Sequence, residues 1–325
     1  MKPKIDGFIL AIIAVVIFAY VFPYWGSKNS PIPLSLIGSI GVSLIFFFYG
    51  LKLSPDKIKS GLKNWKLHLL VQASSFILFP IIIIAIYPFI DSESSFTIWL
   101  GFMFLAALPS TVSSSVVMVS MAKGNIPAAI FNASISGLIG IVITPLWMSL
   151  FLSQTTTDFD LGIIYLKLIT EILLPVIFGI SLQRFLGYYV RKHLRYLTLF
   201  DKSIILLIIY KSFSESFEEN VFSAVNFRDL LMILLAVIVL FTVVYFIIKQ
   251  IAIRLGFSLE DRITAKFCGT KKSLVHGTVF SKILFKNSAS VGIILLPLML
   301  FHFIQIFIIS ILASKLEKQV SLSES

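Results

Sequence analysis

Ten stretches of this chain are apolar over lengths close to or beyond what is needed to cross the roughly 30 Å hydrocarbon core of a bilayer. They cover residues 5–22, 34–50, 67–90, 96–121, 128–152, 161–183, 203–217, 227–255, 262–284 and 288–313. In hydrocarbon a backbone satisfies its own polar groups by forming helices. Only 13% of the residues are charged, against roughly a quarter in soluble domains. The sequence therefore predicts an all-α polytopic membrane protein with ten transmembrane helices.

The seventh and ninth stretches are weaker than the other eight. The seventh is short, and the ninth contains Lys266, Lys271, Lys272 and His276. Hydropathy alone therefore supports about eight spans. Charge favours ten: with a cytoplasmic amino terminus, most of the 27 lysines and arginines lie on the inner side, while acids such as Asp91 lie on the outer side. We expect both termini to be cytoplasmic, in a bacterial inner (plasma) membrane.

The net charge of +11 is explained by this bias, so a lipid membrane is the expected partner and nucleic acid is not. The single cysteine, Cys268, rules out a disulfide framework and a cysteine metal cluster. The sequence contains neither a phosphate-binding loop nor a hydrolase nucleophile motif. We therefore do not expect an enzyme. The oligomeric state stays open, and a monomer is compatible with the sequence.

Two stretches have interruptions in matching places. The fourth is broken at Pro109 in LPSTVSSSVVM, and the ninth is broken around CGTKKSL. Thr111 and Thr270 are 159 positions apart, and Asn125 and Asn287 are 162 apart. Two halves of five spans, 1–155 and 156–325, must insert with opposite orientation because five is odd. The sequence thus predicts an inverted repeat with paired broken helices, which in transporters mark the binding site near the membrane midplane.

Hydroxyl side chains follow the first interruption. A proline ends a helix and removes an amide donor, and hydroxyls together with freed carbonyls suit a dehydrated sodium ion or a polar substrate. The residues concerned are Thr111, Ser113, Ser114 and Ser115. Single serines in membrane helices often bond to their own backbone and permit close packing. For the whole cluster beside a proline, we favour a binding site.

The fifth stretch adds two polar residues on one helical face. Asn132 and Ser136 are four positions apart in FNASISG, so they lie on the same side of a helix. An amide in the middle of a membrane needs a partner, and the serine-rich half of the fourth stretch is the expected one. The alternative is an interhelical hydrogen bond that only holds the helices together.

The adjacent lysines of the ninth stretch require pairing or solvation, because an ammonium group is costly in hydrocarbon. Lys271 and Lys272 lie between Gly269-Thr270 and Ser273, and we include all five residues in the candidate site. In a helix, neighbouring side chains point roughly 100° apart, so we expect one lysine to face the site and favour Lys271. In the alternative interpretation, both lysines point into a cytoplasmic vestibule and follow the positive-inside bias.

Other charged residues in the spans suggest structural roles. Lys167 and Glu171 are four positions apart, as are Lys211 and Glu215, and each pair is expected to neutralise its charges. The histidines are not accompanied by further ligands at metal-binding spacing. We therefore expect no bound transition metal.

The sequence resembles a known family in two specific motifs, LPSTVSSSVVMVSMAKGNIPAAIFNASISGLIGIVITP and FCGTKKSLVHGTVFSKILF. These resemble the bile acid:sodium symporter superfamily, in particular its SBF-like branch, which includes the seventh member of human solute carrier family 10 and bacterial homologues. The resemblance covers essentially the whole chain. It implies a panel domain of spans 1, 2, 6 and 7, a core domain of spans 3–5 and 8–10, and crossing of broken helices four and nine. It also implies secondary transport, by alternating access, of an amphipathic organic anion such as a bile acid, a sterol or a sulfated compound.

The resemblance also implies cation sites at this crossing. One sodium site would use Ser114, Ser115, Asn132 and Ser136, and Gln72 matches a glutamine of the second site. The remaining pattern of the second site departs from the family, because Phe267 stands in place of a glutamate and the two lysines replace a Gln-Asn pair. A lysine there would supply a cation covalently. The coupling ion is then sodium or a proton, and no other cofactor is expected.

A second function stays open at this level. The human relative of the SBF-like branch is associated with calcium homeostasis, so the same fold could belong to a membrane regulator that does not transport. Such a sensor usually carries a soluble output domain, whereas only about a dozen residues follow Ala313. The broken-helix repeat therefore favours the transporter.

Overall fold

The computed structural model describes residues 7–27, 30–52, 64–111, 113–152, 161–218, 220, 225–285, 288 and 290–323. All regular structure within these ranges is helical. The part from residue 7 to 152 contains α1 (Gly7–Val21), α2 (Leu34–Lys52), α4 (Trp65–Ala73), α5 (Phe79–Ile84), α6 (Glu93–Ala107), α7 (Ser113–Met121) and α8 (Ile126–Leu152). The part from 161 onward contains α9 (Leu161–Leu168), α10 (Leu174–Lys192), α11 (Leu194–Glu218), α12 (Phe227–Arg254), α13 (Leu259–Gly269), α14 (Leu274–Leu284) and α15 (Val291–Ser323).

Each of the ten predicted stretches contains helix, and among the described residues six helical segments are long and apolar enough to cross a membrane. These are Leu34–Lys52, Trp65–Phe89, Ile126–Leu152, Gly162–Val190, Phe227–Arg254 and Val291–Ala313. Leu10–Val21 and Glu93–Ala107 are apolar but shorter. The two stretches that were weak in the sequence, now α11 and the pair α13–α14, are not among the six. The chain is thus a multi-pass membrane protein.

The outward faces of the spanning helices are as apolar as the buried ones. On α12, Ile233 and Val237 are buried, whereas Leu231 and Leu235 are half exposed or more. A soluble helix would carry polar residues on that outer face. The exposed leucines are therefore the lipid-facing surface of the helix.

The third stretch changes its helical pitch near a proline. The π-helical turn η2 (Ser74–Leu78) joins α4 to α5, and within it the amide of Phe79 bonds to the carbonyl of Ser74, five residues back. In this register the amide of residue 80 would donate to the carbonyl of Ser75, but Pro80 has no N–H. The Ser75 carbonyl accepts a hydrogen bond from Lys272 instead, and the Phe76 carbonyl accepts one from the indole of Trp147. Because Pro80 lacks an N–H, carbonyls of the preceding turn stay available as acceptors for side chains of other helices.

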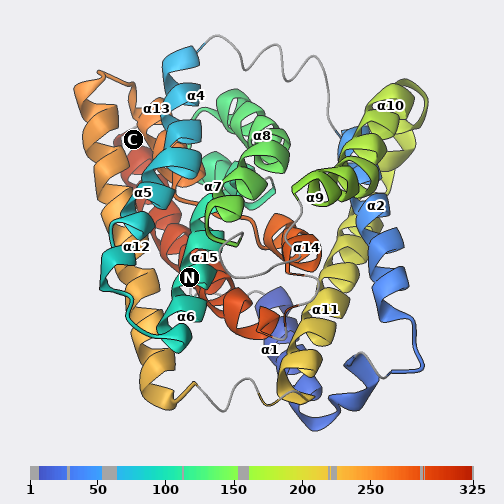
Figure 1. Cartoon of the computed structure of the whole chain (residues 1–325). Coiled ribbons are helices and arrows are strands. Elements are labelled where there is room, and N and C mark those ends of the chain that lie inside the picture. Colours follow the sequence, from blue (N-terminus) through green and yellow to red (C-terminus); the bar gives the residue numbers. More distant parts are fainter. Residues whose placement is uncertain are drawn as a thin grey trace.

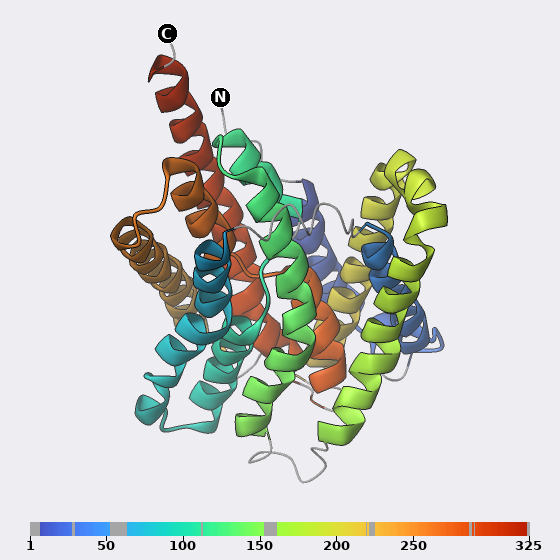
Figure 2. The same ribbon diagram turned by 90° about the horizontal axis from the view of Figure 1, so that it is seen from above.

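The helices form two groups (Figures 1 and 2). One group consists of α1, α2, α10 and α11, and the other of α4, α5, α6, α12, α13 and α15. Between them lie α7, α8, α9 and α14. Direct contact between the two groups occurs where α11 meets α15. The intervening helices add further contacts, of α14 with α11 and of α9 with α8 and α14. A second π-helical turn, η4 (Ile169–Leu173), joins α9 to α10.

Within the smaller group, α2 and α10 approach each other through two glycines. A Cβ atom on Gly50 would lie 2.3 Å from the Val176 carbonyl oxygen, and one on Gly179 would lie 2.2 Å from the Phe47 carbonyl oxygen. Small residues permit this close backbone packing in membranes, where packing rather than water exclusion holds helices together. A larger residue at either position would force the two helices apart.

Candidate functional site

Two helices are interrupted in the middle of the molecule, at the places where the sequence predicted breaks. The first interruption separates α6 from α7 and contains Pro109, while the second separates α13 from α14. The two breaks are bonded to each other: the Ser273 amide donates to the Pro109 carbonyl over 2.9 Å, and the Ser110 hydroxyl donates to the Cys268 carbonyl over 2.7 Å. Backbone groups freed in one helix are therefore satisfied by the other, as a site shielded from water requires.

The predicted residue Ser136 also serves this junction. Its hydroxyl on α8 accepts a hydrogen bond from the Ser110 amide over 3.0 Å. An extended segment has no helical carbonyl available for that amide, so the serine compensates for the break. Ser136 is fully buried, and it fixes α8 against the first interruption.

Lys272 occupies the centre of the junction. Its ammonium group donates three hydrogen bonds, to the carbonyls of Ala106 (2.6 Å), Leu108 (2.8 Å) and Ser75 (2.7 Å), and lies 4.2 Å from the ring centroid of Phe79. An ammonium group has three donors, so all of them are used. Two of the carbonyls belong to the end of α6, where the helix dipole favours a cation. The site holds a positive charge with neutral oxygen ligands.

The backbone of Lys272 is fixed by Gln305 of α15. The Gln305 side chain accepts from the Lys272 amide over 2.8 Å and donates to the Lys272 carbonyl over 2.9 Å. This residue pairs with both polar backbone groups of an unwound position. Gln305 was not among the predicted site residues, although an amide in an otherwise apolar span was a signal for it.

Lys271 is also buried and points to a different partner. Its ammonium group donates to the carbonyl of Ser114 on α7 over 2.8 Å, and the residue has no exposed surface. The expectation that only one lysine would reach the crossing is wrong, because residues 271–273 are not helical. The vestibule alternative is also wrong, because both lysines are fully buried.

The other predicted residues of the second interruption complete the helix ends. The Gly269 carbonyl accepts from the Ser74 hydroxyl over 2.9 Å. The Thr270 hydroxyl donates to the Lys266 carbonyl over 2.6 Å. The Ser273 side chain caps α14 by accepting from the His276 amide. These contacts are of the kind that end and start helices.

The hydroxyls after the first interruption form a small cluster. The Thr111 hydroxyl is 2.9 Å from that of Ser114 and 2.8 Å from that of Ser115. Ser113 begins α7, and its side chain lies outside the description. Asn287, used in the repeat spacing, also lies outside the described residues.

Asn132 bonds to α4 rather than to the serine-rich half-helix, so the expected partner was wrong. Its side-chain nitrogen lies 2.9 Å from His68 Nδ1, and its side-chain oxygen accepts from Gln72 over 3.1 Å. His68 was not among the predicted site residues, because nothing in its local sequence indicates which helix it contacts. Gln72 Oε1 is buried without a hydrogen-bond partner. The predicted sodium ligands are therefore spread over separate hydrogen-bonded groups.

A cavity of about 540 Å³ lies between the two helix groups. Its walls come from α2, α9, η4, α11 and α14, with the segment before α2 and the start of α15. Five charged residues line it, namely Lys167, Glu171, Lys211, Glu215 and Lys282. Such a volume falls within the range of small-molecule sites, roughly 300–1,000 Å³.

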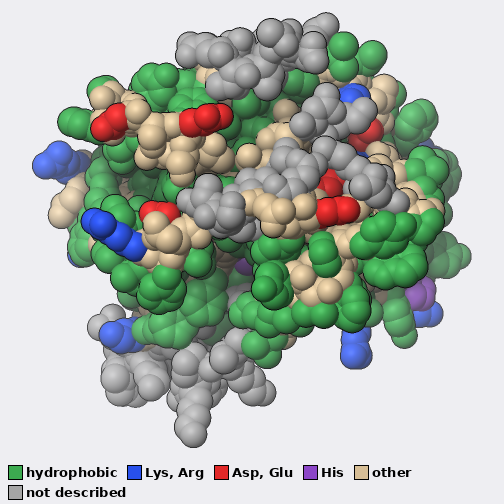
Figure 3. Space-filling model, turned by 60° about the horizontal axis from the view of Figure 1, so that its bottom comes forward, with side chains coloured by type: hydrophobic (Ala, Val, Ile, Leu, Met, Phe, Trp, Pro, Cys, Tyr) green, Lys and Arg blue, Asp and Glu red, His purple; other side chains and the backbone are tan. Residues whose placement is uncertain are grey.

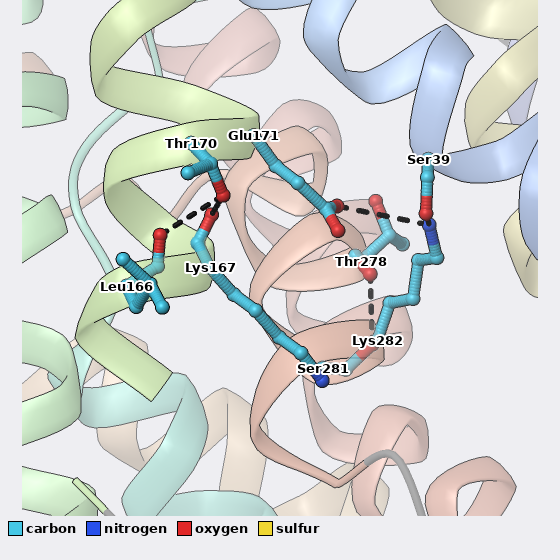
Figure 4. A network of polar contacts seen from close by, with 8 residues as sticks. All are labelled: Ser39, Leu166, Lys167, Thr170, Glu171, Thr278, Ser281 and Lys282. Atoms are coloured by element: carbon cyan, nitrogen blue, oxygen red, sulfur yellow. Dashed lines mark hydrogen bonds and ion pairs between the residues drawn. The ribbon is translucent and has the colours of Figure 1, made fainter. Parts of the chain in front are cut away.

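Two ion pairs occur in this cavity. The predicted pair of Lys211 and Glu215 is confirmed, with a separation of 2.6 Å. Glu171 lies 3.9 Å from Lys282 of α14, and Figure 4 shows the two side chains pointing toward each other from different helices. Lys282, which was not among the predicted site residues, lies in the last turn of α14.

Among the described residues, no group of three or more His, Cys, Asp or Glu residues could hold a metal ion.

Comparison with known proteins identifies the family. The model of the SBF-like CPA transporter family matches residues 6–318. The Pseudomonas aeruginosa protein PA2026 is 39% identical over 95% of this chain and 92% of its own length. YfeH of Escherichia coli, named as a candidate symporter, is 34% identical over 97% and 94% of the two chains. The zebrafish (Danio rerio) protein sodium/bile acid cotransporter 7 is 30% identical over 97% and 95%. This chain belongs to the SBF-like CPA transporter family.

Proposed function

We propose that this protein is a secondary active transporter of an organic anion and works by alternating access. The observation that carries the proposal is the buried junction of two interrupted helices, where Ser273 bonds to Pro109 and Ser110 to Cys268. Discontinuous helices that meet in the membrane mark substrate and ion sites in transporters, since irregular backbone is tolerated only where it has partners. The names of the relatives, a symporter and a sodium/bile acid cotransporter, agree with it.

The architecture that we propose has ten transmembrane helices in two inverted repeats, residues 1–155 and 156–325. Matching interruptions in the fourth and ninth spans support the repeat. The packing of α1, α2, α10 and α11 as one group supports a panel domain of spans 1, 2, 6 and 7, which would move against a core of spans 3–5 and 8–10. The cavity between the groups is where such movement would change access.

This topology gives both termini to the cytoplasm of a bacterial inner membrane. The face seen in Figure 3 carries both acidic and basic side chains among its apolar ones, so the assignment rests on the distribution of lysine and arginine along the sequence. Reporter fusions after Asp91 and at Ser325 test the assignment. Opposite sides are expected, and the same side for both would contradict ten spans.

For the coupling ion, we propose that a lysine takes the place of a bound sodium at the crossing. Lys272 supports this, because its ammonium group has three carbonyl ligands, the kind of ligand that a dehydrated cation would need. Lys271 supplies a second positive group at the start of α7. Transport would then be independent of sodium, with a proton as the candidate coupling ion.

Uptake of radiolabelled anions into proteoliposomes tests the proposed function. Taurocholate and a series of smaller carboxylates and sulfates are the probes, with sodium replaced by potassium or choline. We expect uptake without sodium and a large loss in Ser114→Ala and Asn132→Ala, with the folded protein still extractable. Strict sodium dependence, unchanged in Lys271→Gln, would exclude that lysine as a built-in cation. Absence of uptake for all probes would favour the regulatory alternative.

A further inference from the structure

The cavity between the helix groups has an unusual lining for a site within a membrane protein. Eleven of its 20 lining residues are polar or charged. Five are the lysines and glutamates already named, and six are serines, at positions 27, 30, 35, 39, 212 and 281. Charges within a membrane protein are costly and occur mostly on the paths of substrates or ions. The lining therefore suits a polar solute better than a steroid skeleton.

The charges of the lining do not cancel. Three lysines and two glutamates leave a formal charge of +1 among the described residues that line the cavity. Lys211 and Glu215 form a close pair at 2.6 Å, with the glutamate side chain only 9% exposed. This pair is satisfied internally, so the excess positive charge belongs to the other side of the cavity. A solute that enters there meets an environment favourable to a single negative charge.

The pair of Lys282 and Glu171 is looser. Their nearest atoms are 3.9 Å apart, beyond hydrogen-bond distance. Glu171 Oε2 is buried and has no hydrogen-bond partner, although a buried carboxylate oxygen normally accepts at least one hydrogen bond. Lys282 also donates to the Ser39 hydroxyl of α2. A hydrogen-bond donor of a ligand placed beside Glu171 would satisfy this carboxylate oxygen.

We propose that this cavity binds a polar organic anion that carries a hydrogen-bond donor, with its anionic group on Lys282 and its hydroxyl or amino group on Glu171 Oε2. The inference rests on the proposed transport function and narrows its substrate class. Hydroxy acids and amino acids meet both requirements, whereas a bile acid offers a large apolar body that the serines and charges do not match. The proposal thus favours a smaller and more polar substrate than the bile-acid-like anion that the family resemblance implies.

Binding at this site would also act on the contact between the helix groups. Lys282 belongs to α14, whereas Ser39 belongs to α2 and Glu171 to η4, and Figure 4 shows the side chains of Ser39 and Glu171 pointing toward the Lys282 ammonium group. A ligand anion competes with Glu171 for Lys282. Occupation therefore weakens a direct link between α14, which belongs to the proposed core, and η4, which belongs to the proposed panel, and these two parts must move against each other during alternating access.

Thiol labelling tests the site without knowledge of the natural substrate. The native Cys268 is buried, so Ser35→Cys, on the exposed start of α2, gives one reactive thiol in the cavity. A sulfonate-bearing and a trimethylammonium-bearing methanethiosulfonate are compared, each normalised to its rate with a free thiol. One net charge about 10 Å away in water gives a preference of about fourfold for the anion. We expect this preference, its loss in Lys282→Gln and its increase in Glu171→Gln.

Lys52→Gln is the matched control. Lys52 pairs with Asp201 at 3.2 Å and does not line the cavity, so removal of its charge should leave the ratio unchanged. Equal rates for the two reagents in Ser35→Cys, or an equal effect of the Lys52 and Lys282 substitutions, would overturn the anion site.

Protection of the same thiol by added anions tests whether the ligand needs a hydrogen-bond donor. The probes are gluconate, hexanoate, glutamate and taurocholate, of which only hexanoate lacks a hydroxyl or amino donor. We expect gluconate or glutamate to slow labelling more than hexanoate and taurocholate do, and Glu171→Gln to remove the difference. Greater protection by hexanoate or taurocholate, or none by any probe, would overturn the proposal. The labelling could be charge-selective and protected by ligand while no probe is taken up into proteoliposomes. This result would reject the proposed transport function but support the anion site.

Discussion

The helix junction and the cavity both contain buried or partly buried lysines, but the groups that stabilise these lysines differ between the two regions. At the junction, Lys271 and Lys272 have no exposed surface and donate to backbone carbonyls. In the cavity, the side chains of Lys211 and Lys282 are 23% and 17% exposed and lie beside carboxylates. Carbonyls solvate a cation without neutralising it, whereas carboxylates cancel its charge.

The difference separates a fully ligated lysine from one whose partners can exchange. Lys272 uses all three of its donors on carbonyls of two helical segments, so any ligand would have to break several bonds to reach it. The contacts of Lys282 include a carboxylate beyond hydrogen-bond distance and the hydroxyl of Ser39. We infer that the junction stabilises the fold and fixes the positions of the buried lysines. The cavity residues make the contacts that a ligand can break and form again.

The strongest test of this contrast removes the junction cation. Lys272→Met keeps the length of the side chain but leaves three buried carbonyls without a donor, and each costs about 1–3 kcal/mol. We expect a loss of stability of at least about 3 kcal/mol, measured as a large fall in the thermal unfolding midpoint of the detergent-purified protein. Lys271→Met, which removes one hydrogen bond, should have a clearly smaller effect. Equal effects would mean that the three-carbonyl arrangement is not what stabilises the junction.

A second prediction concerns the residue that fixes the backbone of Lys272. Gln305→Leu is similar in volume but removes both hydrogen bonds to that unwound position. We expect a loss of about 2 kcal/mol, since a buried amide and a buried carbonyl lose their partners. Gln305→Glu retains an acceptor for the amide and serves as the intermediate case. An unchanged unfolding midpoint for Gln305→Leu would show that water or another group replaces the glutamine.

The smallest effect is expected for the ion pair in the cavity. A double-mutant cycle with Lys211→Gln and Glu215→Gln should give a coupling free energy below about 1 kcal/mol, because partly hydrated pairs contribute little. The coupling should also fall with added salt. A salt-independent coupling above about 2 kcal/mol would indicate that the cavity is dry, and the distinction between the two regions would then fail.

Much of the fold could be predicted from local sequence. Long apolar runs specified the helices, and Pro109 marked the first interruption at the residue where the structure has it. Lys211 and Glu215 were predicted as a pair because four positions along a helix bring side chains together. In each case the information lies within a few neighbouring residues.

The partners of the site residues were the part that sequence did not predict. Asn132 could have met any polar group on a neighbouring helix, and the structure pairs it with His68 and Gln72. The ion pair of Glu171 with Lys282 joins residues more than a hundred positions apart in the sequence. Spacing along a helix cannot foresee contacts between helices.

The sequence by itself determined that this chain is helical, where its helices break and which residue types stand at the breaks, because hydropathy and the missing amide of proline act locally. Only the tertiary structure decided what those residues do. The freed carbonyl of Ser75 and the end of α6 lie more than 160 positions before Lys272. Packing of α4–α5, α6 and α13–α14 brings these groups within 2.6–2.8 Å of one ammonium group. In an environment without water, a buried cation must be satisfied by whichever oxygens the fold places beside it.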